Sequence, residues 1–166
     1  MPSDRFVEAL NDQISRELLA AYQYTAVGAW YDRMTLPRLA KFFFGQADEE
    51  RGHAMKMVDY LRDTGAELRL GQVPAPRMEF ADHVEPIRLS LEYERKVTVA
   101  ISSLFQIARE TGDYASESFM QWFVDEQIEE EATMDSLLQV AERVRDQPMM
   151  LEEFLARDGG ELGSAG

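Results

Sequence analysis

One spacing of polar residues occurs twice in this chain, at an offset of 77 positions. In each copy a glutamate is followed, 33 positions later, by a pair of polar residues that are three positions apart. The first copy is Glu17 with Glu50-x-x-His53, and the second is Glu94 with Gln127-x-x-Glu130. Residues at i and i+3 share one face of an α-helix. The repeat therefore predicts two similar helical hairpins with polar side chains on their inner faces.

A turn signal lies at the centre of each copy. Thr35-Leu36-Pro37 interrupts the first half of the chain and Thr111-Gly112-Asp113 the second, and proline or glycine commonly marks a helix boundary. The outermost polar residues of each copy lie 18 positions on either side of its turn. If each half is a pair of antiparallel helices, these residues meet at one height.

Four long segments carry apolar residues at the spacing of an amphipathic helix. A polar residue interrupts each apolar stripe near its middle. The stripes run from Phe6 to Tyr24, from Leu39 to Tyr60, from Ile87 to Ala108 and from Phe119 to Ala141. We therefore expect an all-α fold built on a four-helix bundle.

A long connection separates the second and third helical segments. It spans residues 65–81, and connections in compact domains are usually only about four to six residues long. Fully extended at roughly 3.3 Å per residue, it could run the whole length of the bundle. It permits a crossover that would make helices two and three parallel, without requiring one. Asp82-x-x-Glu85 matches a capping box for the third helix.

The end of the chain predicts a short fifth helix. Pro148 can open it, with an apolar stripe of Met150, Leu151, Phe154 and Leu155. About ten residues are too few for a stable isolated helix, so this segment must pack against something. We expect residues 1–158 to form a single domain and residues 159–166 to form a disordered tail.

The composition excludes several classes of partner and site. With 166 residues, 45% of them hydrophobic, the chain is long enough to bury a core. Its net charge of -14 argues against nucleic acids and anionic membranes as partners and favours cations. The absence of cysteine excludes disulfides and thiolate metal sites. We expect no signal peptide and no membrane span, and therefore a cytoplasmic protein.

Four glutamates occupy apolar stripes on four different predicted helices. A single glutamate in such a position usually lies at the edge of the stripe with its carboxylate in water. Here the spacing places Glu17, Glu50, Glu94 and Glu130 in one layer, and no Lys or Arg occupies a matching position. Burying even one unpaired charge costs several kcal/mol. A bound multivalent cation is the simplest way to neutralise such a layer.

His53 adds one imidazole to this oxygen-rich set. A lone core histidine is more often merely hydrogen-bonded, but Glu50 precedes His53 by three residues, so both side chains share a face. Oxygen ligands with a single imidazole suit Fe(II) or Mn(II), whereas closed zinc sites more often use cysteine or several histidines.

These residues resemble the ferroxidase centre of non-haem bacterial ferritins, particularly the actinobacterial type. The resemblance extends from about Phe6 to Phe154 and rests on Glu17, Glu50-Arg51-Gly52-His53, Glu94 and Glu126-Gln127-Ile128-Glu129-Glu130. Ferritin-like di-metal proteins generally pair Glu-x-x-His with a second Glu-x-x-His, whereas this chain has Gln-x-x-Glu as its second pair. The resemblance implies a ferritin-like four-helix bundle with a long crossover between helices two and three and a short C-terminal fifth helix.

The resemblance also implies a dinuclear iron centre at which each ligand has a role. Iron site A would comprise Glu17, Glu50 and His53. Glu50 would bridge to site B, which Glu94 and Glu130 complete. The two sites would then differ, because only site A has a nitrogen ligand.

Further residues enter through the same resemblance. Gln127 would be a polar neighbour of the iron sites rather than a firm ligand. Tyr24 would lie beside the dinuclear centre and supply a hydrogen bond or an electron, as could Trp122, for which ordinary aromatic packing is the alternative. A third iron site would share Glu130 and use Glu49, Glu126 and Glu129, although acidic runs are commonly just solvated.

By this resemblance the chain is expected to be an iron-storage ferritin and a ferroxidase. It would oxidise Fe(II) with dioxygen and store Fe(III) as a mineral inside a hollow homo-oligomeric shell of twenty-four subunits. Haem is not expected, because bacterioferritins usually carry a haem-ligating Met where this chain has Arg51 and His where it has Glu130. The alternatives are a bacterioferritin-like haem protein, a di-iron or di-manganese oxidase of a small substrate, and a non-enzymatic bundle whose acidic residues are exposed.

Overall fold

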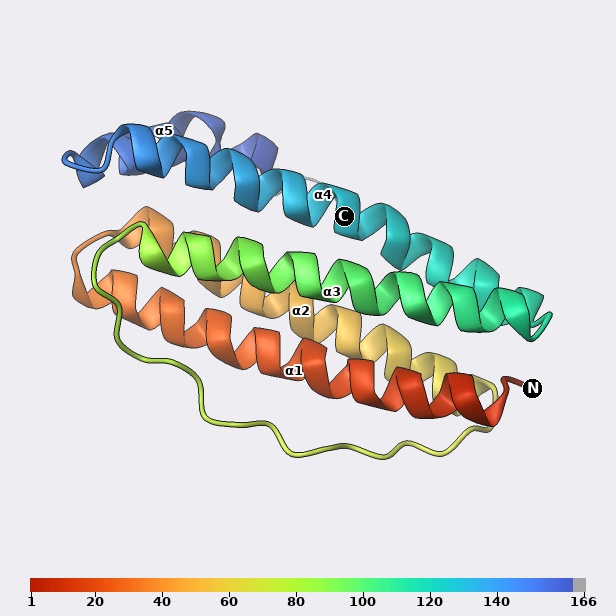
Figure 1. Ribbon diagram of the computed structural model, residues 1–166. Coiled ribbons are helices and arrows are strands. Elements are labelled where there is room, and N and C mark those ends of the chain that lie inside the picture. Colours follow the sequence, from red (N-terminus) through yellow and green to blue (C-terminus); the bar gives the residue numbers. More distant parts are fainter. Residues whose placement is uncertain (163–166) are drawn as a thin grey trace.

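Five helices make up most of the chain that the computed structural model describes, which is the backbone of residues 1–162 and the side chains of residues 1–158. They are α1 (Asp4–Arg33), α2 (Pro37–Asp63), α3 (Glu85–Glu110), α4 (Tyr114–Arg143) and α5 (Pro148–Leu162). Figure 1 shows α1 to α4 side by side as a long bundle, with α5 at one end. The predicted all-α fold, with a four-helix bundle and a short fifth helix, is confirmed. None of these helices is both long enough and apolar enough to cross a lipid bilayer.

Each predicted turn joins two antiparallel helices. In the first, Pro37 opens α2, where its fixed φ and missing N–H are tolerated. Thr35 just before it has a φ of 60°, in the left-handed region that a β-branched residue rarely adopts. In the second, Gly112 takes a φ of 65° after α3. The carboxylate of Asp113 then accepts a hydrogen bond from the backbone N–H of Ser116 in the first turn of α4.

The connection between α2 and α3 follows the bundle from one end to the other. Figure 1 shows it passing beside α1, so that α2 and α3 run in the same direction and the expected crossover is present. We call residues 66–81 the strap. Three side chains of α1 form hydrogen bonds with backbone groups of the strap. Asn11 bonds to Glu67 and Arg69, Ser15 to Gly71, and Gln23 to Arg77. Side chains of α1 therefore satisfy part of the strap's backbone, which has no partner strand.

α3 begins with a variant of the predicted capping box. The carboxylate of Asp82 accepts a hydrogen bond from the backbone N–H of Glu85 at 2.9 Å, as expected, and another from Val84. The Glu85 carboxylate accepts from the backbone N–H of Ala81, at 2.5 Å, instead of from Asp82. The return bond is thus shifted by one residue, and Val84 occupies the N-cap position.

A buried carboxylate joins α5 to α2. Glu152 is only 5% exposed, and its two oxygens accept the backbone N–H groups of Arg38 and Leu39, each at 2.9 Å. These N–H groups belong to the first turn of α2, whose own N-cap residue, Leu36, provides no side-chain acceptor. Glu152 of α5 therefore caps the N-terminus of α2, and this contact holds the short fifth helix to the bundle.

The end of α5 lies beyond the boundary expected from the sequence. Helix α5 continues to Leu162, past the domain boundary at residue 158 that the sequence predicted, and the disordered tail stays a prediction. Gly159 and Gly160 lower helix propensity by about 1 kcal/mol each relative to Ala, but they do not block the helical conformation. The rest of the expected tail, residues 163–166, lies outside the described residues.

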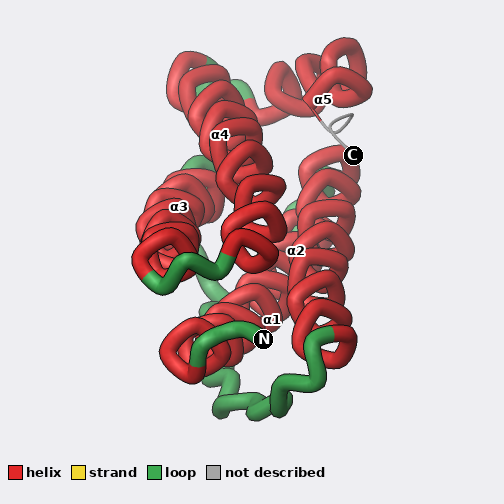
Figure 2. The backbone as a smooth tube through the Cα atoms, turned by 90° about the vertical axis from the view of Figure 1, so that its right-hand side faces the viewer, coloured by secondary structure: helices red, strands yellow, loops and turns green. Residues whose placement is uncertain are grey.

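The apolar core consists of two clusters separated by a polar layer. One cluster includes Tyr31 and Leu39 near the α1–α2 turn, and the other includes Phe6 and Leu61 near the opposite end. Figure 2, which looks towards the end of the bundle, shows α1 to α4 around a common interior. Midway along that interior the buried polar residues are Gln13, Glu17, Gln46, Glu50, His53, Glu94, Gln127 and Glu130.

Candidate metal centre

Each of the four long helices contributes a candidate ligand to this polar layer. Glu17 comes from α1, Glu50 and His53 from α2, Glu94 from α3, and Glu130 from α4. Each points inward because it occupies a core position of its helix's apolar stripe. All five side chains are at most 6% exposed. The residues that the sequence spacing placed at one height do meet in the interior.

The candidate ligand atoms form three groups, within each of which the atoms lie no more than 4.8 Å apart. The groups share members, so that they make one continuous cluster. Glu50 belongs to two of them, and so do His53 and Glu130. The groups are Glu17 with Glu50 and His53, Glu50 with Glu94 and Glu130, and His53 with Glu126 and Glu130.

The first group surrounds one nitrogen of the imidazole. Nδ1 of His53 lies 3.3 Å from Oε2 of Glu50 and 3.8 Å from Oε2 of Glu17. The side-chain amide of Gln13, one turn earlier on α1, donates to Oε1 of Glu17 at 2.7 Å. Gln13 therefore fixes one oxygen of Glu17 and leaves the other directed at the histidine.

The second group is held by two hydrogen-bond donors at Glu94. The hydroxyl of Tyr24 donates to Oε1 of Glu94 at 2.5 Å, and the amide of Gln127 donates to Oε2 at 3.2 Å. The same amide also lies 3.2 Å from the backbone carbonyl oxygen of Glu94. Tyr24 and Gln127 thus orient the carboxylate, and in this arrangement Gln127 presents its amide nitrogen rather than an oxygen to the centre.

The predicted third site is only partly brought together. Oε1 of Glu126 lies 3.9 Å from Nε2 of His53, and Glu126 joins His53 and Glu130 in the third group. Glu49 is half-buried, and its carboxylate accepts a hydrogen bond from Gln46 at 3.2 Å. Glu129 is exposed. Among the described residues, neither Glu49 nor Glu129 belongs to a three-residue group.

Burial and mutual repulsion shift the ionisation of the carboxyl groups. Burial raises the pKa of Glu50 well above its usual range, and the charge of Glu17 adds to that effect. Burial and then the charge of Glu94 raise the pKa of Glu130 to about 9. Burial also acts to raise the pKa of Glu17, but the neighbouring His53 and Glu50 side chains outweigh it and leave that pKa lowered. Without a cation, the cluster retains protons that separate glutamates in water would lose.

The donor set fits a multivalent cation. Oε2 of Glu17 and Oε1 of Glu50 are buried and have no hydrogen-bond partner in the described part of the chain. A buried acceptor without a partner costs about 1–3 kcal/mol, and more when it is charged. Within the same residues, the ion pairs that reach these two carboxylates come from His53 and not from Lys or Arg. A cation held between the two carboxylates would satisfy both oxygens.

Some residues around the centre were not identified from the sequence. Gln13 is the first, and its position four residues before Glu17 is the signal that could have identified it. Thr98 is the second: its hydroxyl lies 3.3 Å from the amide of Gln127 and donates to Glu131 at 2.5 Å. Its position four residues after Glu94 is a comparable signal, but its link to Gln127 depends on how α3 and α4 face each other.

Trp122, on α4, packs beside the imidazole of His53 on α2. The ring centroids of Trp122 and His53 lie 5.5 Å apart. The ammonium of Lys56 lies 3.6 Å from the centre of the indole ring, in a cation–π contact. A positive charge held against the ring opposes removal of an electron from it. The environment of Trp122 therefore favours packing over electron donation.

The chain matches a known family over most of its length. The family model of the ferritin-like domain matches residues 7–144. Ferritin BfrB of Mycolicibacterium smegmatis is 40% identical over 160 residues, which cover 96% of this chain and 88% of the relative. The bacterial non-heme ferritin of Staphylococcus aureus is 40% identical over 146 residues, which cover 88% of each chain.

Solved structures agree with these sequence relatives. An open-pore ferritin from the archaeon Archaeoglobus fulgidus gives a TM-score of 0.88 at 30% identity and covers 99% of this chain and 98% of its own. A humanised archaeal ferritin gives a TM-score of 0.90 at 31% identity and covers 100% of this chain and 99% of its own. With a ferritin-like bundle, a family match from residue 7 to residue 144 and relatives of this similarity, the chain belongs to the ferritin family.

Proposed function

We propose that this iron-storage ferritin oxidises Fe(II) with dioxygen in its buried polar layer and passes the Fe(III) to a mineral. Iron binding and storage follow from membership of the family. The observation that carries the proposal of a ferroxidase is the position of Glu50, which belongs to two compact three-residue groups at once. Two metal ions that share a bridging carboxylate can act together on one small molecule.

The two iron positions differ in their ligands. Position A, formed by Glu17, Glu50 and His53, includes one nitrogen. Position B, formed by Glu50, Glu94 and Glu130, offers oxygen ligands only. Anionic oxygen ligands stabilise the higher charge of Fe(III) relative to Fe(II), so both positions favour loss of an electron and position B favours it more.

Proton release accompanies the binding of iron. Burial favours the protonated forms of Glu50 and Glu130 in the metal-free protein. A cation binds the deprotonated carboxylates, so these groups give up protons as Fe(II) enters. Tyr24 and Gln127 keep their hydrogen bonds to Glu94 and hold it in place while the protonation of its neighbours changes.

We propose a third iron position beside the first two, at Glu126 and Glu130, which lie next to the Nε2 side of His53. The grouping of these side chains supports it. The half-buried Glu49 lies at the edge of this position, whereas the exposed Glu129 is suited to a later step on the path of the iron. Substitution Glu126→Gln should lower the number of tightly bound Fe(II) ions, and Glu129→Gln should leave that number unchanged.

We propose that the chain assembles into a cytoplasmic shell of twenty-four copies with the mineral inside. Large apolar side chains on the surface of the single subunit support assembly, since such groups commonly mark interfaces. Among them are Tyr22, Leu70, Met78, Ile128 and Met149, each more than half exposed. Light scattering on a size-exclusion column tests the proposal, and a stable monomer would refute the shell.

The ferroxidase proposal is tested by anaerobic titration with Fe(II) followed by exposure to dioxygen. We expect at least two tight Fe(II) equivalents, two of them at the groups that share Glu50, and rapid oxidation afterwards. Glu50→Ala should impair both binding and oxidation. Asp48→Ala serves as the control, because Asp48 is an exposed acid on the same helix. Equal oxidation rates in the wild type and Glu50→Ala would refute the site assignment.

The expected absence of haem stays a prediction of the sequence. It has a direct spectroscopic check, since bound haem gives an intense absorption band near the edge of the visible range. The purified protein should lack this band, and Arg51→Met should not create it unless the rest of a haem pocket is already present.

A further inference from the structure

A second tyrosine lies between Tyr24 and the surface of the bundle. The ring centroids of Tyr24 and Tyr93 are 6.5 Å apart, and the rings meet edge to face at an angle of 76°. Both rings line one small cavity of about 110 Å³ between α1 and α3. Tyr24 is 1% exposed and donates to Glu94, so its hydroxyl faces the proposed iron centre. Tyr93 is only partly buried.

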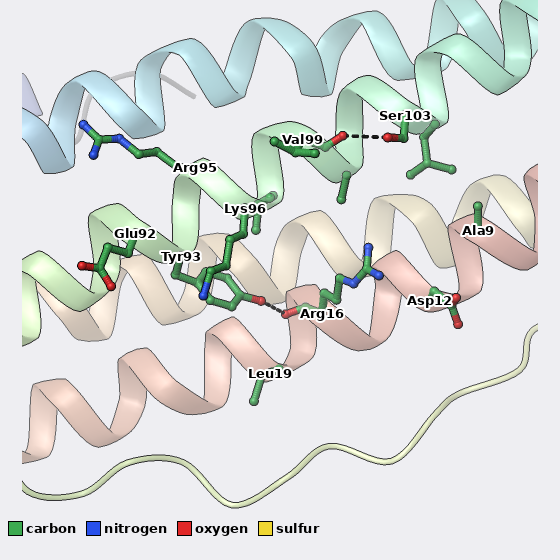
Figure 3. A pocket seen from close by; sticks show the side chains of 13 residues that line it. Ala9, Asp12, Arg16, Leu19, Glu92, Tyr93, Arg95, Lys96, Val99 and Ser103 are labelled. Atoms are coloured by element: carbon green, nitrogen blue, oxygen red, sulfur yellow. Dashed lines mark hydrogen bonds between the residues drawn. The ribbon is translucent and has the colours of Figure 1, made fainter.

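Tyr93 opens into a large groove on the outer side of α1 and α3. The groove has a volume of about 1020 Å³. Figure 3 shows Tyr93 reaching from α3 towards α1, where its hydroxyl donates to the backbone carbonyl of Arg16 at 2.6 Å in an exposed position. An oxidisable side chain is therefore in contact both with solvent and with the aromatic neighbour of the iron centre.

The groove gathers positive charge on a strongly acidic protein. Arg16, Arg95 and Lys96 line it, together with apolar residues such as Leu19 and Val97, whereas the chain as a whole carries a net charge of -14. Asp12 and Glu92 line it as well, and Arg95 lies 3.9 Å from Asp135 of α4, so the positive excess in the groove is small and centres on Arg16 and Lys96. The lining favours a small organic anion, because the cations attract its charge and the apolar floor accepts its carbon skeleton.

The other aromatic neighbours are poorer electron carriers. Phe43 also packs against Tyr24, with ring centroids 5.8 Å apart, but it has no hydroxyl and its ring is much harder to oxidise. Trp122, beside His53, is held under the ammonium of Lys56. Of these three neighbours of the centre, Tyr93 alone combines an oxidisable ring with contact to Tyr24.

We propose that Tyr93 relays single electrons to Tyr24 from a small anionic reductant of the enediol class bound in the groove between α1 and α3. The proposal rests on the ferroxidase function above. Two Fe(II) ions supply two electrons, whereas reduction of dioxygen to water consumes four electrons and four protons. Tyr24 can supply one of the two missing electrons and, once an outer reductant has restored it through Tyr93, the other as well, while water supplies the four protons.

Each electron that passes along the relay is accompanied by the movement of one proton to a defined acceptor. Tyr24 gives one electron to the reduction of dioxygen, and its hydroxyl proton passes to Glu94, the acceptor of its hydrogen bond. Tyr93 then gives one electron to oxidised Tyr24, which takes its proton back from Glu94, while the proton of Tyr93 passes to water in the groove. The enediol donates one electron and one proton to Tyr93 and leaves as its own radical.

The test uses ascorbate as the reductant and three forms of the assembled protein. Wild type, Tyr93→Phe and the control Tyr114→Phe are loaded with Fe(II), mixed with dioxygen and frozen at timed intervals for electron paramagnetic resonance. Tyr114 is 82% exposed at the start of α4, away from the groove. Wild type and Tyr114→Phe should show a tyrosyl radical that ascorbate removes quickly. In Tyr93→Phe the radical should stay on Tyr24 and be removed several-fold more slowly.

A charge variant tests the groove separately. Lys96→Glu keeps both tyrosines but reverses one charge of the groove, so the removal of the radical by ascorbate should slow by about tenfold at low ionic strength. Equal removal rates in wild type and Tyr93→Phe would overturn the relay. If iron oxidation stays rapid in that case, only the relay fails; if wild type oxidises no iron, the ferroxidase proposal fails and the relay with it.

Discussion

The carboxylate of Glu152 in α5 accepts a hydrogen bond from the backbone N–H of Leu39 in α2 at 2.9 Å, although the two residues are 113 positions apart. Its second oxygen accepts from Arg38. The negative charge also lies at the positive end of the α2 dipole. The short fifth helix thus supplies the N-terminal cap that the sequence of α2 lacks.

Removing this cap should weaken the whole bundle. Glu152→Ala leaves the backbone N–H groups of Arg38 and Leu39 without their acceptors, and loss of an N-cap typically costs about 1 kcal/mol. Thermal unfolding of the protein should show a lower midpoint. Glu153→Ala is the control, because its 68% exposed side chain pairs only with Arg157 among the described residues. Identical midpoints for the two variants would contradict the cap.

Gln13 should govern the affinity of the first iron position. Its amide holds Oε1 of Glu17 at 2.7 Å, and loss of such an orienting partner typically costs about 10–100-fold in metal affinity. Gln13→Ala should therefore weaken one class of Fe(II) sites in anaerobic titration calorimetry while the second class keeps its affinity. Gln121→Ala, which loses only an exposed hydrogen bond to Asp125, should bind Fe(II) as the wild type does.

The metal-free protein should lose stability as the pH rises. Burial raises the pKa of Glu130 from 4.5 to about 9 in the folded protein, so the folded state keeps a proton that the unfolded state releases. This contribution is complete below pH 4.5 and is lost as the pH rises towards about 9. The slope for one group is at most about 1.4 kcal/mol per pH unit.

Urea unfolding of the metal-free protein across this range measures the effect. Glu130→Gln has no proton to lose at this position, so its stability should fall less steeply with pH than that of the wild type. Glu129→Gln, at an exposed position, should retain the wild-type slope. The same slope in all three proteins would show that Glu130 is ionised in the folded, metal-free state.

Thr35 offers a route to a more stable protein. Its φ of 60° costs a residue with a Cβ about 1–2 kcal/mol, whereas Gly65 and Gly112 take the same conformation freely at the other two turns. Thr35→Gly should raise the unfolding midpoint, with a net gain of at most about 1 kcal/mol because glycine also loses more entropy on folding. Thr111 has a φ of -88°, so Thr111→Gly should lower the midpoint instead.

The layer of polar residues could be predicted because it depends only on distances along the chain. Glu17 and His53 are equally far from their turn, and antiparallel helices with the same rise per residue bring such positions to one height. The family resemblance added the bridging role of Glu50, which spacing alone did not distinguish from the roles of the other glutamates.

The links between distant segments could not be predicted in this way. The cap from Glu152 to α2 and the bonds from Asn11 to the strap join residues with no common period. The groove beside Tyr93 depends on how α1 and α3 are spaced, and a sequence pattern gives no measure of that spacing. The helix end at Leu162 was missed because glycine lowers helix propensity without preventing a helix.

The division of the polar layer between two hairpins has a consequence for motion. Glu17, Glu50 and His53 belong to the hairpin of α1 and α2, whereas Glu94 and Glu130 belong to that of α3 and α4. An ion bound by ligands from both sets links the two hairpins. Its binding free energy therefore adds to the free energy needed to separate them. Backbone amides at the interface between the two hairpins should therefore exchange hydrogen more slowly as more iron binds. The two hairpins should separate most often in the iron-free subunit and least often in the loaded one.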